Sequence, residues 1–171
     1  MDVGDGGTIR KGRPSDLDII KAIADASRSA IGFVPRPALA RGIECGWMLV
    51  AQSRQEVIGF ANYRHRQDQQ TTLYEICVAE GHRRGGIGRA LLRALIKESR
   101  NVGKTVIRLK CPMDSEANSF YRRVGFVQSS QQPGKIRPLT CWERQLGDDG
   151  SQDGGNMTTG TRLVWPEEVF E

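Results

Sequence analysis

The sequence Leu73-Tyr-Glu-Ile-Cys-Val-Ala79 continues through Glu80-Gly-His-Arg-Arg-Gly-Gly-Ile-Gly88 into Arg89-Ala-Leu-Leu-Arg-Ala-Leu-Ile-Lys97. The first part is rich in apolar and β-branched residues and too short for a stable helix, so it predicts a buried or half-buried strand. In the last part, apolar residues recur at the spacing of one face of a helix. The stretch therefore predicts a strand, a glycine-rich turn and a helix.

The turn is suited to binding an anion. Glycines there permit positive φ and remove the Cβ atoms that would block a ligand, so successive N–H groups can converge on one oxygen-rich group. The helix that follows adds the positive end of its dipole, and three arginines add full charges. A phosphate is the expected ligand, and the predicted binding residues are Arg83, Arg84, Gly85, Gly86, Ile87, Gly88 and Arg89.

Spacing separates this turn from two other nucleotide-binding turns. A dinucleotide-binding fingerprint needs a third glycine at the position of Leu91, and a P-loop needs Lys and Ser or Thr where Arg89-Ala90 stands. The remaining pattern, Arg83-x-x-Gly86-x-Gly88 after a strand that ends in Val78-Ala79, resembles the acetyl-coenzyme A signature of the GCN5-related N-acetyltransferase (GNAT) superfamily. Glu80 stands where that family often has proline. The resemblance also implies coenzyme contacts at the strand end, from Cys77, Val78 and Ala79.

A second motif strengthens the resemblance. The sequence Asn118-Ser-Phe-Tyr121-Arg-Arg-Val-Gly125-Phe126 is similar to the downstream motif of the superfamily. There an asparagine contacts the pantetheine arm and a tyrosine approaches the coenzyme thiol, which implies these roles for Asn118 and Tyr121. The resemblance covers residues 8–146.

The family resemblance implies an α/β (α+β) fold. Its expected form is a single mixed, mostly antiparallel sheet of six to seven strands, flanked by about four helices, with a splayed central strand pair. We expect a flexible N-terminus over residues 1–7, the acetyltransferase domain over 8–146, and a disordered acidic, Gly-rich tail over 147–171. Periodicity places strands at 8–11, 47–52, 57–65, 71–79, 104–111, 126–127 and 139–146, helices at 15–29, 38–43, 87–97 and 115–124, and a polar loop at 128–138.

Composition fits one globular domain, since 38% of the 171 residues are hydrophobic and 26% are charged. No apolar run has the length of a membrane span and the N-terminus lacks a secretory signal, so a cytoplasmic protein is expected. Four scattered cysteines indicate neither a metal site nor a disulfide framework. The tail carries a net charge of −5, which leaves +10 on residues 1–146. Such a domain attracts anions, whether coenzyme A, nucleic acid or an acidic protein surface.

Transfer of an acetyl group to an amine requires a base for the amine, donors for the tetrahedral oxyanion and an acid for the leaving thiolate. By its match to the family tyrosine, Tyr121 is the candidate acid. Backbone N–H groups near Val78 are the candidate oxyanion donors. Glu75, a carboxylate in the middle of an apolar strand, must be satisfied either as a general base that lines the cleft or by pairing with a basic side chain.

Other residues remain open on sequence grounds. Phe33 and Val34 either line the acceptor cleft or pack on the core, and His65 and His82 are expected to be solvated. The predicted function is direct transfer of an acetyl group from acetyl-CoA to an amine, which is a protein N-terminus or lysine, a small amine or an aminoacyl-tRNA. The alternatives are a non-catalytic CoA-binding regulatory protein and a basic nucleic-acid-binding module. A homodimer is compatible with the sequence, whereas nucleic acid is not favoured because aromatic and basic residues do not interleave.

Overall fold

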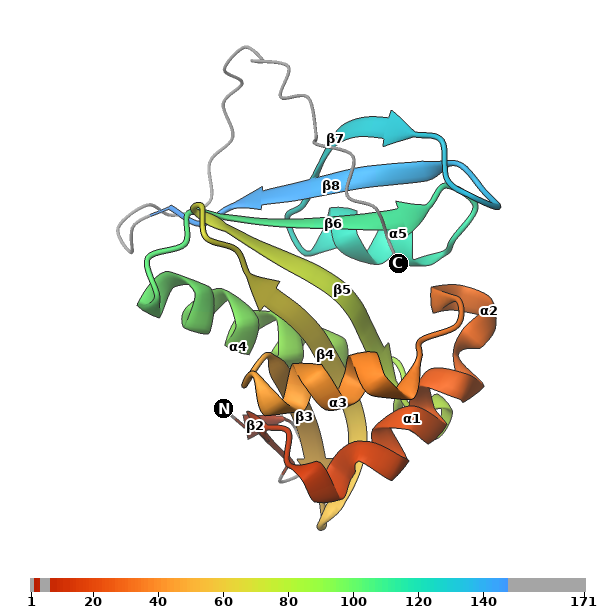
Figure 1. Ribbon diagram of the computed structural model, residues 1–171, viewed down its shortest axis with the longest axis vertical. Coiled ribbons are helices and arrows are strands. Elements are labelled where there is room, and N and C mark those ends of the chain that lie inside the picture. Colours follow the sequence, from red (N-terminus) through yellow and green to blue (C-terminus); the bar gives the residue numbers. More distant parts are fainter. Residues whose placement is uncertain (1, 4–6, 148–171) are drawn as a thin grey trace.

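The computed structural model describes residues 2–3 and 7–147. Its strands form one sheet with the order β1-β2-β3-β4-β5-β6-β8-β7 (Figure 1). The strands are β1 (Asp2–Val3), β2 (Gly7–Lys11), β3 (Met48–Ser53), β4 (Glu56–His65), β5 (Gln70–Val78), β6 (Val106–Pro112), β7 (Val127–Gln132) and β8 (Leu139–Gln145). All neighbours are antiparallel except β5 and β6, which are parallel. The predicted mixed, mostly antiparallel sheet is therefore confirmed.

The parallel pair separates soon after it forms. Gln70, Thr71 and Thr72 of β5 pair with Val106, Ile107 and Arg108 of β6, and the pairing ends there. The remainder of β6 pairs with β8, so the two strands diverge (Figure 1). Among the described residues, β5 beyond Thr72 has no strand partner on its β6 side. This confirms the predicted splayed central pair.

Helices cover both faces of the sheet. They are α1 (Leu17–Ala26), α2 (Arg28–Ile31), α3 (Arg36–Glu44), α4 (Ile87–Asn101) and α5 (Ala117–Arg123), with 3₁₀ turns η1 (Pro14–Asp16) and η2 (Glu80–His82). Alternate residues of β3 show the division, since Val50 packs with the residues of α1 and α3, and Leu49 packs with those of α4 and α5. Because successive strand residues point to opposite faces, one short apolar strand supplies both cores.

A β-bulge decides which way the candidate base faces. Tyr63 of β4 pairs with Leu73, but the preceding Asn62 pairs with Glu75, so Tyr74 is an extra residue on β5. A bulge of this kind shifts the side-chain alternation by one residue. Glu75 consequently lies on the same face as Asn62, which is beside Gly42 of α3. Without the bulge, Glu75 would share the α4 face with Leu73.

The structure corrects several sequence predictions. The polar loop predicted at 128–138 is wrong for its first half, because β7 continues to Gln132 as an edge strand. Its residues are polar on both faces and none is buried, so no alternation marked it as a strand. The helix predicted from Ser15 begins instead at Leu17, after a 3₁₀ turn, and it ends at Ala26. In this turn the backbone N–H of Arg13 donates to the carboxylate of Asp16 at 2.7 Å.

The counts also differ slightly from the prediction. The described residues form eight strands and five α-helices, against six to seven strands and about four helices, because β1 and α2 are very short. Residues 148–171, nearly all of the predicted acidic tail, lie outside the described residues, as do residues 1 and 4–6. Within the described residues no helix is both long and apolar enough to span a membrane.

Candidate active site

The predicted anion-binding turn adopts the backbone that such a turn needs. Gly86 is the N-cap of α4 and has φ +81°, and the neighbouring Arg84 has φ +67°. In the described part of the chain, no side chain caps this helix and no backbone acceptor is found for the N–H groups of Ile87, Gly88 and Arg89. These donors lie at the positive end of a 15-residue helix. Free donors at such a helix end are suited to an anionic group of oxygens.

Gly88 also has a packing role. A Cβ atom at this position would lie 3.4 Å from Cζ of Phe120 and 4.0 Å from Cγ2 of Val78. The missing side chain therefore allows α5 and the end of β5 to approach the first turn of α4. Gly88 thus joins the turn to the second motif as well as leaving its N–H group accessible.

Arg83, predicted to add charge near the turn, also makes two bonds that the sequence did not predict. Its Nε donates to the carbonyl of Val78 at 3.1 Å, and a terminal guanidinium nitrogen donates to Ser27 Oγ at 3.4 Å. Burial raises the pKa of the Cys77 thiol, and Ser27 partly opposes this rise. Arg83 thus ties the end of β5 to the end of α1, while the exposed Arg84 and Arg89 supply the charges near the turn.

Glu75 has the properties of a poised base. The residue is half-buried, and burial raises the pKa of its carboxylate to about 7, although the hydrogen bond from Asn62 Nδ2 at 2.8 Å opposes this rise. Within residues 7–147 it has no Arg or Lys partner, so the ion pair left open by the sequence is not formed. A carboxylate with a pKa near neutrality is well matched to proton transfer at that pH.

Tyr121 lies close to both sides of the opening between β5 and β6. Burial, followed by the nearby Cys111, Cys77 and Glu75, raises the pKa of its hydroxyl, so the group stays protonated. Cys111 belongs to β6, whereas Cys77 and Glu75 belong to β5. Among the described residues, the hydroxyl has no hydrogen-bond partner. Phe120 and Phe126 hold the ring by edge contacts, with centroids 5.4 and 5.7 Å away.

The backbone of β5 offers a donor to the same opening. The N–H of Ala79 donates to Ile58 of β4 at 2.8 Å. Successive N–H groups of a strand point to opposite sides, so the N–H of Val78 points to the β6 side. No strand lies there beyond Thr72 among the described residues. The predicted oxyanion donor near Val78 thus faces the opening that Glu75 and Tyr121 border.

Asn118 has a structural function that sequence reasoning missed. Its Nδ2 donates to the carbonyls of Pro112, Met113 and Ser115 at 2.8, 3.1 and 2.9 Å, and its Oδ1 accepts from Trp142 Nε1 at 2.8 Å. The side chain therefore fixes the turn from β6 to α5 and ties it to β8. Its contact with the pantetheine arm stays a prediction. To make that contact, the side chain would have to give up one of these bonds.

The structure separates Phe33 from Val34, and His65 from His82, by their exposure. Val34 is 5% exposed and packs with the core of α1 and α3, whereas Phe33 is 60% exposed. His82 is exposed, but the prediction of a solvated His65 is wrong. Its Nδ1 is 2.8 Å from Thr71 Oγ1, and its Nε2 is 3.5 Å from Glu98. Glu98 lies on a distant helix, so no local pattern identifies it as a partner of His65.

The structure also adds two residues that the sequence did not single out, Asn62 and Ser27. Asn62 interrupts the apolar run of β4, just as Glu75 interrupts that of β5. A polar side chain in such a run needs a buried partner, and that signal was available for Asn62. Ser27 carried no such signal, since it follows a helix whose end the sequence misplaced.

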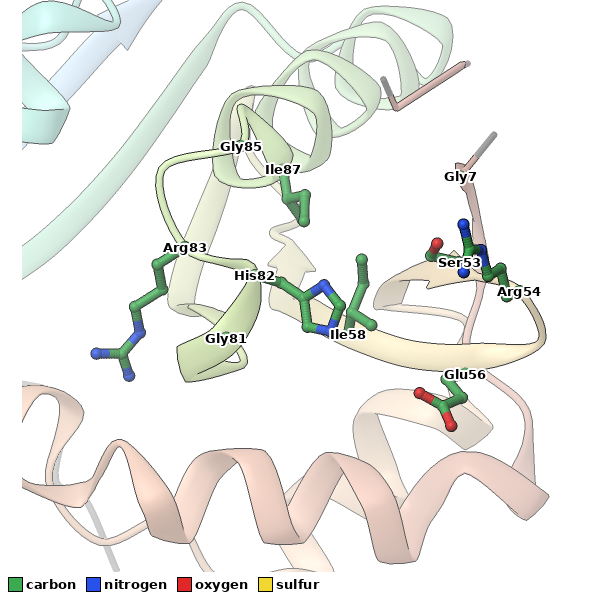
Figure 2. Close-up of a pocket in the computed structure, with 10 residues that line it drawn as sticks. All are labelled: Gly7, Ser53, Arg54, Glu56, Ile58, Gly81, His82, Arg83, Gly85 and Ile87. Atoms are coloured by element: carbon green, nitrogen blue, oxygen red, sulfur yellow. The ribbon is translucent and has the colours of Figure 1, made fainter. Parts of the chain in front are cut away.

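A shallow hollow borders the turn from its other side. It is lined by Gly7, Ser53, Arg54, Glu56, Ile58, Gly81, His82, Arg83, Gly85 and Ile87 (Figure 2). No lining residue comes from β5, β6 or α5, so the hollow is separate from the opening beside Glu75. Figure 2 shows the Arg83 side chain pointing away from the other lining residues, in keeping with its bonds to Val78 and Ser27. We therefore place the candidate site at the opening.

Comparison with solved structures identifies the class of fold. The Ard1 protein of Thermoplasma volcanium has a TM-score of 0.77 at 24% identity, over 83% of this chain and 99% of that one. Ribosomal-protein-alanine N-acetyltransferase from Brucella melitensis has a TM-score of 0.68 at 26% identity, over 81% and 99%. A Salmonella typhimurium protein solved with its cofactor acetyl-CoA has 0.69 at 25%, over 87% and 99%. A search of curated proteins gave no match.

The sequence agrees with this class. Residues 44–128, which include the turn, Glu75 and Tyr121, match the family model described as an acetyltransferase (GNAT) domain. The chain belongs to the GNAT superfamily of acetyltransferases. The predicted family is thereby confirmed.

Proposed function

We propose that this protein transfers an acetyl group from acetyl-CoA directly to an amine, with Glu75 as the base and Tyr121 as the acid. The observation that carries the proposal is the meeting of three groups at one opening. These are a carboxylate with a pKa of about 7, a protonated phenol and a backbone N–H group directed into the gap between β5 and β6. General acid, general base and oxyanion donor are the functions that acyl transfer needs.

Binding of the coenzyme is assigned to the turn. Its phosphate oxygens accept from the N–H groups of Ile87, Gly88 and Arg89, and Arg84 and Arg89 add charge. The pantetheine arm then follows β5 into the opening, where β6 has left strand donors without partners. The likeness to a protein solved with acetyl-CoA supports this cosubstrate.

In the proposed chemical step the acceptor is a neutral amine, and one of its N–H protons passes to Glu75, directly or through a water. The amine nitrogen bonds to the thioester carbonyl carbon, and the resulting oxyanion accepts from the Val78 N–H. The intermediate collapses as the carbon–sulfur bond breaks, and the departing thiolate takes the proton of Tyr121. The products are an amide and coenzyme A, with no covalent intermediate on the enzyme.

The proposed acceptor is an amine, and its class is to be found by experiment. The Brucella relative is named for an alanine of a ribosomal protein, and another neighbour, 13% identical, is an aminoglycoside 6'-N-acetyltransferase. Peptides with N-terminal alanine, peptides with internal lysine, polyamines, aminoglycosides and aminoacyl-tRNA therefore form the panel to test. Labelled acetyl-CoA reports transfer to any of them.

The experiment that tests the mechanism uses whichever acceptor the panel yields. Tyr121→Phe keeps the packed ring but removes the proton donor, so kcat should fall about 10²-fold with little change in coenzyme affinity. Glu75→Gln should remove the limb of the kcat/KM profile that rises near pH 7. Full activity in Tyr121→Phe would assign the tyrosine to packing. Coenzyme binding without transfer to any acceptor would favour the regulatory alternative.

A further inference from the structure

The outer face of α4 carries positive charge along its whole length. Arg89, Arg93, Lys97 and Arg100 are exposed and recur at spacings of four, four and three residues. Residues at these spacings lie on one side of a helix. With a rise of 1.5 Å per residue, the row extends for about 17 Å. We call these four residues the α4 row.

The only acidic residue of α4 is directed away from the row. The side chain of Glu98 is 23% exposed and contacts Lys11, Tyr63 and His65. Burial alone would raise the pKa of Glu98, but these hydrogen bonds outweigh it and lower the pKa to about 2, so the charge is fixed on the inner side. The outward face of α4 therefore holds cations with no anion of the same helix among them.

Such a face has a cost that an ordinary solvated helix avoids. Like charges four residues apart repel each other, as Arg89 and Arg93 do, and Arg93 and Lys97. A cation at Arg89 also lies at the positive end of the helix dipole. A mixture of signs would solvate the helix without these costs. The coenzyme accounts only for Arg89, because the row continues away from the turn to the opposite end of the helix.

The chemistry of the row distinguishes between two kinds of partner. Between Ile87 and Asn101 the described structure exposes no large apolar side chain. A protein interface normally has an apolar or aromatic centre, which this face does not offer. Three of the four residues are arginines, whose planar guanidinium groups bind phosphate by paired hydrogen bonds. We propose that the α4 row binds the phosphodiester backbone of a nucleic acid, without reading its sequence.

The proposed contact is independent of the acetyl transfer. It agrees with the absence of aromatic-basic interleaving, because backbone binding through charge needs no base stacking. Its signature is dependence on salt, since each neutralised phosphate releases counterions. The whole chain, including its acidic tail, should therefore bind a single-stranded oligonucleotide of mixed sequence at low salt and lose it as salt rises.

The test compares two triple variants of the full chain by fluorescence anisotropy with that oligonucleotide. Arg93→Gln/Lys97→Gln/Arg100→Gln removes most of the row but leaves Arg89 and the turn. Arg13→Gln/Arg41→Gln/Lys135→Gln removes the same charge from exposed positions on other elements. Log K, where K is the association constant for the oligonucleotide, is measured against log salt between about 50 and 200 mM. The magnitude of the slope should be smaller by about 2 in the row variant than in the unmodified chain, and the control variant should show a smaller change.

Three outcomes would overturn the proposal. One is absence of binding by the unmodified chain at low salt. Another is equal loss in the two variants, which would show a general effect of net charge. The third is competition by polyglutamate as strong as that by unlabelled oligonucleotide, which would indicate an acidic protein partner. Thermal unfolding checks that both variants fold.

Discussion

Glu75 is half-buried, and the hydrogen-bond partner of its carboxylate is the neutral amide of Asn62. The cost of ionising it in the folded protein is the same quantity that raises its pKa from 4.5 to about 7. Stability and the proposed function of Glu75 as a base are thus linked at one residue. A well-solvated carboxylate at this position would favour folding at neutral pH but would be a weaker base.

This linkage gives a prediction that needs no acceptor. Below pH 4.5 Glu75 is protonated in both folded and unfolded states, and no penalty arises. Above pH 7 it is ionised in both, and the full penalty, at most about 3 kcal/mol, lowers the free energy of unfolding. Glu75→Gln should therefore become more stabilising, relative to the unmodified chain, as pH rises from 4.5 through 7, by roughly 5–10 °C in Tm.

Glu98→Gln supplies the opposite control. The pKa of Glu98 is lowered to about 2, so its contribution to stability is complete above pH 4.5 and is lost as pH falls through about 2. The variant should be destabilised at neutral pH and less so in acid. A Glu75→Gln effect that does not vary with pH would contradict the raised pKa.

At the scale of elements, the turn between β5 and α4 depends on backbone more than on side chains. Gly86 has φ +81°, and no atom lies within 4 Å of where its Cβ would be. Gly103 follows the other end of the same helix; it has φ +74° and equally open space. The two glycines have nearly the same conformation and equal space around them. They differ in their distance from the predicted phosphate site.

We predict that these matched glycines separate strain from binding. Gly86→Ala and Gly103→Ala should each lower the free energy of unfolding by about 1–2 kcal/mol, because alanine is strained at positive φ. Coenzyme A affinity, measured by calorimetry, should fall several-fold for Gly86→Ala alone, since the strain distorts the donors of the turn. Equal affinity for coenzyme A in the two variants would contradict its binding at this turn.

The same scale shows where sequence reasoning stops. Apolar periodicity located α4 and β5, and glycine spacing located the turn, because these signals lie within a few consecutive residues. The bulge at Tyr74 has no such signal, although it sets the face on which Glu75 lies. Asn118 was predicted from a motif, but its bonds to Trp142 and to the carbonyl of Pro112 depend on the arrangement of three elements. The predicted strand at 126–127 was too short, because the exposed polar residues of β7 that follow Val127 have no period.

At the scale of the whole molecule, the described domain closes at Leu146. This residue is buried with the α4 core, and its N–H donates to the carbonyl of Thr105 at 2.7 Å. The strand β8 that precedes it pairs with both β6 and β7. The sequence that follows is rich in Gly and Asp, and such a composition favours a segment that does not contribute to a core.

We therefore predict that a chain ending at Gly147 folds and binds coenzyme A as the full chain does. Leu146 must be kept, because its removal would expose the core and leave the carbonyl of Thr105 without its donor. The truncated chain should melt within about 2–4 °C of the full one, which is the change expected from about 1 kcal/mol in a domain of this size. A larger decrease would show that Trp165 and Phe170 contribute to the fold. The truncation also removes a net charge of −5, so it should strengthen oligonucleotide binding at low salt if the α4 row acts as proposed.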